Sequence, residues 1–234
     1  MPGPTPAAAP TRAAVARALD HAVLKPEYTA ADLARHAASC VDLGVGCLCV
    51  RSADAAAAAR LLAGTPVVVA SVVGFPHGGQ RSEVKAREAG LAIADGAREL
   101  DMVMNLGAFL SGDLATVRDD VAAVVGEAGP ARVVVKVILE TCHLTPDQIA
   151  AACRIAEEAG ADFVKTSTGF GPGGATPEAV RVMLDTVGGR LGVKASGGIR
   201  TWGAAVGYLA LGCRRIGVGD AAAILAGQPA GTGR

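Results

Sequence analysis

The sequence predicts an α/β protein, a (β/α)8 TIM barrel formed as a single domain. Eight short apolar runs recur along the chain, and an Ala-rich amphipathic stretch follows each of them. The runs are apolar on both faces, which is typical of strands in a parallel sheet covered by helices. The 234 residues leave roughly 29 residues for each strand–helix unit, which suits a closed barrel.

In chain order, the expected strands occupy residues 20–24, 46–50, 66–73, 99–104, 132–139, 161–166, 191–196 and 214–218. The expected helices begin near Thr29, Ser52, Gln80, Gly112, Thr145, Thr176 and Thr201, with a short last helix after Gly219. Several begin on a residue that caps helices well and is soon followed by an acid, as in Thr145-Pro146-Asp147. An open doubly wound sheet is the alternative, but its usual G-x-G-x-x-G after the first strand is missing.

The barrel is expected over residues 11–226, between disordered tails at 1–10 and 227–234. The formal net charge of zero favours neither a nucleic-acid nor a membrane partner. The N-terminal segment lacks the apolar region of a secretory signal, and no apolar run approaches the ~20 residues that cross a bilayer. Six cysteines without zinc-site spacing are expected to be reduced thiols of a cytoplasmic protein.

Lysines are scarce and oddly placed. The chain has only five lysines among its 22 basic residues, so arginine is expected to carry the surface positive charge. Yet Lys136, Lys165 and Lys194 lie inside apolar strand runs, spaced 29 residues apart, which predicts equivalent positions on three consecutive strands. A buried lysine beside another cation has a lowered pKa, and its neutral amine can form a Schiff base. The alternative is that each lysine is only a structural ion-pair partner.

The alternation of side chains along a strand predicts which acids face the barrel interior. Leu100, Met102 and Met104 share one face and should meet the helices, so Asp101 should point inward. The same reasoning places Asp20, Lys136 and Glu140 inside. An inward Asp101 can shuttle protons through a water or simply neutralise a lysine.

Six segments resemble the deoxyribose-phosphate aldolase family. They are LDHAVLKP (19–26), VVGFPHGGQRSEVKAREA (72–89), ELDMVMNLGAFLSGD (99–113), VVVKVILETCHLT (133–145), GADFVKTSTGF (160–170) and GVKASGGIRT (192–201). The resemblance implies a (β/α)8 barrel that reversibly cleaves 2-deoxy-D-ribose 5-phosphate to acetaldehyde and D-glyceraldehyde 3-phosphate. It also implies a small-molecule sugar phosphate and an aldehyde as the ligands, with no metal and no cofactor.

By motif, the resemblance makes Lys165 the imine-forming lysine, Lys194 the second lysine that lowers its pKa, and Asp101 the proton-relay acid. Further matches imply substrate-binding positions at Asp20, Thr166 and Thr168. The four histidines are interpreted as structural or surface residues: His21, His36, His77 and His143.

Glycines after the last three strands predict the phosphate site, because barrels of this kind often hold phosphate there on backbone N–H groups. They are Gly169, Gly197, Gly198, Gly217 and Gly219. Asp220 departs from the small hydroxyl residues usual in the family, and either caps the last helix or faces the ligand. Phe170 replaces a lysine found in some members, Ala22 replaces a hydroxyl residue, and the tail has no tyrosine.

Two alternatives to the main prediction remain, and the departures at Asp220 and Phe170 motivate the first. One is a related class I aldolase that prefers a non-phosphorylated deoxy sugar. The other is a sugar-phosphate-binding barrel without aldol chemistry, such as an isomerase or a sensor. A homodimer is one assembly that the sequence leaves open.

Overall fold

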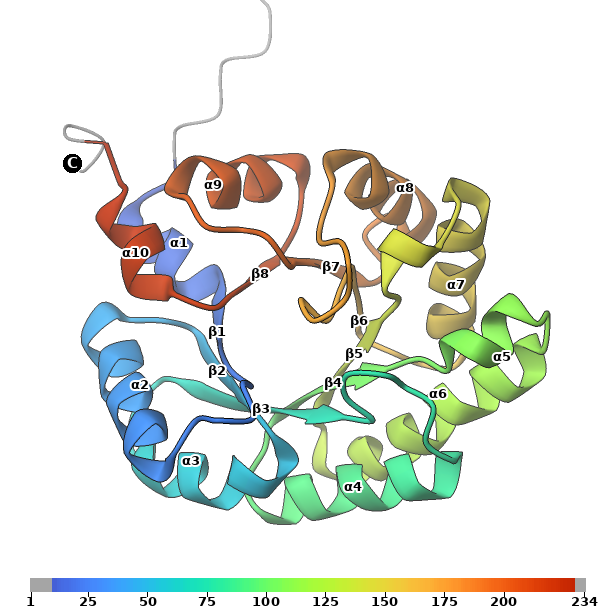
Figure 1. Ribbon diagram of the computed structural model, residues 1–234, viewed down its shortest axis with the longest axis horizontal. Coiled ribbons are helices and arrows are strands. Elements are labelled where there is room, and N and C mark those ends of the chain that lie inside the picture. The colour runs from blue at the N-terminus through green and yellow to red at the C-terminus, as the bar shows by residue number, and fades with distance from the viewer. Residues whose placement is uncertain (1–9, 230–234) are drawn as a thin grey trace, which may run out of the picture.

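The computed structural model describes residues 10–229. Eight parallel strands close into a barrel in the order β1 to β8, with β8 pairing back onto β1. Helices surround the strands on the outside (Figure 1). The predicted (β/α)8 barrel is therefore confirmed, and the open doubly wound sheet is excluded.

Each of the eight predicted strands is present, within a few residues of its expected bounds. The strands are β1 Leu19–Val23, β2 Cys47–Val50, β3 Val68–Val73, β4 Glu99–Val103, β5 Val134–Ile138, β6 Phe163–Lys165, β7 Gly192–Ser196 and β8 Arg215–Val218. The α-helices are α1 Arg12–Ala18, α2 Ala30–Leu43, α3 Ala55–Leu61, α4 Ser82–Ala94, α5 Leu106–Leu110, α6 Leu114–Ala128, α7 Pro146–Glu158, α8 Pro177–Val187, α9 Trp202–Leu211 and α10 Ala221–Ala226.

The helices begin where the sequence offers caps. Thr29 and Thr145 each form a capping box, and the hydroxyls of Thr176 and Thr201 accept hydrogen bonds from the third helical N–H. Two short helices were not predicted. They are α1, which precedes the first strand, and α5, which follows β4. Both are five to seven residues long, too short for a clear helical period in the sequence.

Two apolar clusters lie on opposite sides of the strands. The larger packs the outer strand faces against the helices and includes Leu100, Met102 and Met104, as the alternation predicts. The smaller lies inside the barrel, on β2, β3 and the end of β1, and consists of Leu24, Cys47, Cys49, Ala70 and Val72. One wall of the interior is therefore apolar, and the charged side chains come mainly from the other strands.

The predicted equivalence of the three lysines is only partly correct. Lys165 pairs with Lys194 across β6 and β7. Lys136, however, pairs with Phe163, while Lys165 lies opposite Ile138. Lys136 therefore lies two residues nearer the N-terminal end of the barrel than Lys165. Equal spacing in sequence does not give equal height, because loops differ in length and barrel strands are staggered.

The expected tails fall largely outside the described residues, namely 1–9 and 230–234. Within the described part, Gly227 caps the end of α10. No helix among residues 10–229 is both long enough and apolar enough to cross a membrane.

Candidate active site

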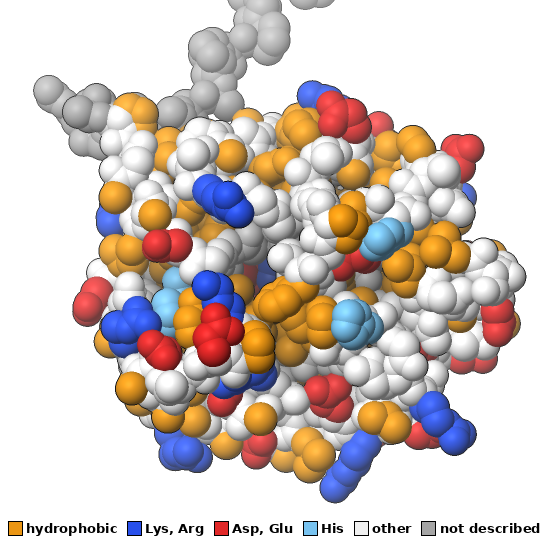
Figure 2. Space-filling view, viewed as in Figure 1, with side chains coloured by type: hydrophobic (Ala, Val, Ile, Leu, Met, Phe, Trp, Pro, Cys, Tyr) orange, Lys and Arg blue, Asp and Glu red, His pale blue; other side chains and the backbone are white. Residues whose placement is uncertain are grey.

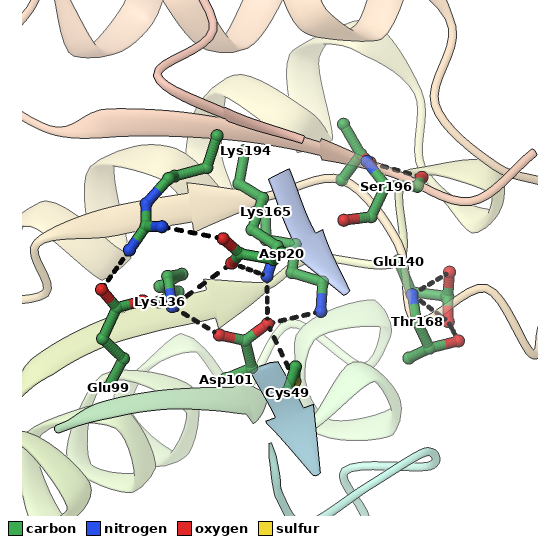
Figure 3. Close-up of polar contacts among 12 residues, drawn as sticks. Asp20, Cys49, Glu99, Asp101, Lys136, Glu140, Lys165, Thr168, Lys194 and Ser196 are labelled. Carbon is green, nitrogen blue, oxygen red and sulfur yellow. Dashed lines mark hydrogen bonds and ion pairs between the residues drawn. The ribbon is translucent and has the colours of Figure 1, made fainter. Parts of the chain in front are cut away.

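Three charged side chains meet at the centre of the barrel. The Nζ atoms of Lys165 and Lys194 lie 2.6 Å and 2.7 Å from the same carboxylate oxygen, Oδ2 of Asp101. The lysines come from adjacent strands, and Asp101 approaches from β4 across the barrel (Figure 3). All three are at least 95% buried. The structure thus brings together the three residues that the sequence predicts as catalytic.

The environment of Lys165 favours its neutral amine. Burial lowers the pKa of Lys165 most strongly, and the charge of Lys194 lowers it further, against the opposing effect of Asp101. The second lysine therefore acts in the predicted direction, although desolvation is the larger cause.

The two partners of Lys165 remain ionised. Burial would neutralise Lys194, but the carboxylates of Asp101 and Asp20 outweigh it and raise the pKa of this lysine. Burial likewise opposes ionisation of Asp101, but three lysines hold the pKa of its carboxyl well below the usual range. The site therefore pairs one easily deprotonated amine with a charged lysine and a charged carboxylate.

A second layer of charge lies beneath these residues, toward the N-terminal ends of the strands. Lys136 Nζ lies 2.8 Å from Asp101 Oδ1 and 2.5 Å from Glu99 Oε2. Arg215 pairs with Glu99 and, at 3.0 Å, with Asp20 Oδ1, whose other oxygen pairs with Lys194. Asp101 pairs with Lys136 as well as with Lys165 and Lys194, so this one carboxylate connects the lower layer to the residues at the cavity.

Sequence reasoning missed Glu99 and Arg215 as members of this cluster. Glu99 lies two residues before Asp101 and so shares its face, a signal that was available. Arg215 was hidden by the expectation that arginines cover the surface. Its side chain is only 16% exposed.

A cavity of about 690 Å³ opens above Lys165 and Lys194. Figure 2 shows this end of the molecule, with hydrophobic, basic and acidic side chains close together around its centre. The predicted residues on the cavity wall are Asp20, Thr168, Gly169, Gly197, Gly198, Gly217 and Gly219. Two basic residues that were not predicted, Lys25 and Arg200, also line it.

Thr166 is not among the residues that line this cavity. It is fully buried, and its hydroxyl donates to Ser196 O and accepts from Ser196 N. It therefore joins β6 to β7 directly above the two lysines. Ser196 does line the cavity, and its buried Oγ has no hydrogen-bond partner among the described residues.

The carboxylate of Glu140 holds the loop that follows β6. It accepts hydrogen bonds from the backbone N–H of Thr168 and, at 2.5 Å, from the Thr168 hydroxyl. That hydroxyl in turn accepts from Phe170 N. Glu140 was predicted to face the barrel interior, but it lies just beyond β5 and lines a separate side cavity of about 260 Å³.

Three of the departures from the family pattern, Ala22, Phe170 and Asp220, line the cavity. Asp220 caps α10 by accepting from Ala223 N at 2.9 Å, and it also lines the cavity. Asp220 therefore both caps the last helix and lines the cavity, so the two interpretations of this residue are compatible. Phe170 is 49% exposed and packs edge-to-face on Phe75.

One group of possible metal ligands occurs among the described residues. It consists of Asp20, Cys47 and Glu99. Lysine and arginine side chains already pair with both carboxylates, and burial raises the pKa of the Cys47 thiol well above its usual value. A protonated thiol and two paired carboxylates do not fit a metal ion.

The four histidines lie outside the lysine cluster. His21 bonds to His36 and accepts from Ala221 N, so this pair ties β1 to α2 and α10. His77 and His143 line the side cavity.

Comparisons with known proteins agree with this geometry. A family model described as DeoC/LacD family aldolase matches residues 14–206. The chain is 52% identical to the deoxyribose-phosphate aldolase of Mycobacterium avium, over 93% of this chain and 98% of that protein. It is 50% identical to that of Nocardia farcinica, over 95% and 98%.

Solved structures give the same result. A putative deoxyribose-phosphate aldolase from Coccidioides immitis is 38% identical with a TM-score of 0.89, covering 93% of this chain and 87% of that one. The tetrameric deoxyribose phosphate aldolase from Aeropyrum pernix is 32% identical with a TM-score of 0.87, covering 92% and 91%.

Proposed function

The chain belongs to the DeoC/LacD family of aldolases, and we propose that it reversibly cleaves 2-deoxy-D-ribose 5-phosphate through a Schiff base on Lys165. The products are acetaldehyde and D-glyceraldehyde 3-phosphate. The observation that carries the proposal is the approach of the Lys165 and Lys194 amines to one buried carboxylate beneath the cavity.

In this mechanism the neutral amine of Lys165 adds to the carbonyl carbon of the open-chain sugar, and the carbonyl oxygen leaves as water. The protonated imine draws electrons from the bond between C2 and C3, which breaks to give an enamine on the lysine. A base must take the proton of the C3 hydroxyl, and an acid must protonate the enamine carbon. We assign the movement of these protons, through a water, to Asp101. Water then hydrolyses the resulting imine, which releases acetaldehyde and regenerates the Lys165 amine. Lys194 stays positive and keeps protons off Lys165.

The phosphate is assigned to the outer part of the cavity. Gly197, Gly198 and Gly219 offer backbone there, and the side chains of Lys25 and Arg200 add two positive charges. Asp220 would repel a dianion, but its Oδ1 is engaged by Ala223 N. The two cations outnumber this carboxylate and favour the phosphorylated substrate.

Borohydride trapping tests the role of Lys165. After incubation with acetaldehyde, the reduced adduct should map to Lys165, and Lys165→Ala should abolish cleavage. Lys85→Met is unsuitable as a control because Lys85 is buried against Asp120. The exposed Lys25 serves instead, since Lys25→Met should still be trapped at Lys165. An adduct on another residue, or none, contradicts the proposal.

The alternative of a non-phosphorylated substrate is motivated by Asp220 and Phe170 at the cavity rim. Comparing kcat/KM for deoxyribose and its 5-phosphate decides it, and Lys25→Met should weaken only the phosphorylated substrate. A barrel without aldol chemistry would instead keep its activity in Lys165→Arg, which cannot form an imine. We also propose a cytoplasmic location, supported by six unpaired cysteines.

A further inference from the structure

The charged groups inside the barrel do not balance. The cations of the cluster are Lys136, Lys165, Lys194 and Arg215, and the carboxylates are Asp20, Glu99 and Asp101. Four positive groups thus face three negative ones when all are ionised. Releasing one proton makes the buried cluster neutral, which a medium of low polarity favours.

No other titratable group in the described part of the interior supplies the missing negative charge. β2 contributes the thiols of Cys47 and Cys49, and burial raises the pKa of both, to about 11 for Cys49. β3 contributes Ala70 and Val72. Both thiols are therefore uncharged near neutral pH, and the excess of one cation stands.

The four cations differ in how firmly they hold their protons. Arg215 remains charged at any ordinary pH. Carboxylates raise the pKa of Lys136 and of Lys194 despite burial. Lys165 has one carboxylate partner, Asp101, and its pKa is lowered. The proton that leaves the cluster is therefore that of Lys165.

Arg215 supplies the fourth positive charge of the cluster from a position outside the cavity. Its guanidinium bridges Asp20 and Glu99 beneath the lysine layer. It is not among the residues that line the cavity. By engaging one oxygen of Asp20 it also leaves only the other oxygen for Lys194.

We propose that Arg215 is a positioning residue of the reaction, whose charge, set against Asp20 and Glu99, gives the interior one cation too many and so causes Lys165 to release its proton. The inference rests on the proposed role of Lys165. In this role Arg215 changes the pH range in which the Lys165 amine is reactive, whereas a purely structural role would affect only folding. Lys165 must lose a proton before its nitrogen can form the C–N bond to a carbonyl, whose oxygen then leaves as water.

The test is the pH dependence of acetaldehyde trapping by borohydride on Lys165, followed by mass spectrometry. In Arg215→Met the interior is already neutral with Lys165 protonated. The acid limb, which is the fall in trapping rate on the acidic side of the pH profile, should therefore move to higher pH by at least one unit. Trapping should then be about tenfold slower at neutral pH and approach the unchanged protein at alkaline pH. Arg215→Lys keeps the charge and should retain the original limb. Arg214→Met is the matched control, because Arg214 is exposed and its guanidinium bonds to Gly189 O.

Glu99→Gln provides a second measurement if Arg215→Met does not fold. It removes a negative charge from the same cluster, so the limb should move to lower pH, opposite to the effect of Arg215→Met. An unchanged limb in Glu99→Gln, or in a folded Arg215→Met, overturns the inference while adducts still form on Lys165. Failure of the proposed function is distinct, because then the unchanged protein gives no adduct on Lys165.

Discussion

At the scale of single residues, Lys194 packs closely against a glycine. A Cβ atom built on Gly217 would lie 2.2 Å from Ser196 Oγ and 3.3 Å from Lys194 Cε. Gly217 pairs with Asp20 on β1 and lines the cavity. The absence of a side chain on Gly217 therefore leaves space for Lys194 to reach the carboxylates of Asp20 and Asp101. This is a packing reason, distinct from the phosphate-binding role that the sequence predicts for the same residue.

Gly217→Ala should impair catalysis more than folding. Relieving the overlap costs typically ~1–3 kcal/mol of stability, whereas a shift of Lys194 by about 1 Å can lower the rate on the order of 100-fold. The measurements are kcat for cleavage and the free energy of unfolding in urea. Gly203→Ala, on α9 with no atom within 4 Å of its Cβ, is the control. Wild-type kcat in Gly217→Ala would show that this close packing does not position Lys194.

At the scale of elements, the loop after β6 is held by one unusual residue. Glu140 has a left-handed backbone, with φ of 54°, which disfavours residues other than glycine. Its carboxylate accepts from both the N–H and the hydroxyl of Thr168. The strained backbone is thus compensated by hydrogen bonds that fix the loop carrying Thr168 and Phe170 on the cavity wall.

Glu140→Gln should loosen this loop and affect binding. The amide offers one oxygen, and its NH₂ group cannot accept a hydrogen bond from either donor of Thr168. We expect KM to rise several-fold with a smaller change in kcat, since Lys165 itself is held by β6. Steady-state kinetics measure both, and Glu158→Gln on the exposed side of α7 is the control. A loss confined to kcat would instead show that Glu140 takes part in the chemical step.

The strands were predictable from the sequence, and their relative heights were not. Apolar runs and the alternation of side chains place Asp101 and the lysines inside the barrel, because these signals are local. The register between β5 and β6 depends on barrel stagger, which no local pattern encodes. Lys136 therefore lies lower than predicted.

The charged layer beneath the site was missed for a related reason. The contact between Arg215 and Glu99 joins residues 116 positions apart, and only barrel closure brings them together. Arginine is also ordinarily a surface residue. The alternation of side chains on β8 nevertheless gives a signal, because Ile216 and Val218 face the helices and Arg215 lies on the opposite face. The family resemblance did predict Lys165, Lys194 and Asp101, which the barrel brings together.

At the scale of the whole molecule, closure joins the first strand to the last elements of the chain. His21 on β1 accepts from Ala221 N at the start of α10, and its other ring nitrogen bonds to His36 on α2. Burial, followed by the neighbouring His36, lowers the pKa of His21 to about 4, against the opposing charge of Asp220. His21 is therefore neutral when it fastens α10 to the barrel.

Acid should weaken this closure before the buried carboxylates are protonated. The pKa of His21 falls on folding from 6.5 to about 4, so its stabilising effect is complete above pH 6.5 and is lost as the pH falls toward 4. The loss is on the order of 3 kcal/mol for such a difference. His21→Gln can still accept from Ala221 N and does not titrate, so its free energy of unfolding in urea should fall less between pH 7 and 4.5. His77→Gln, at an exposed position, should keep the original slope, and equal slopes in all three proteins would show that His21 does not fasten α10 in this way.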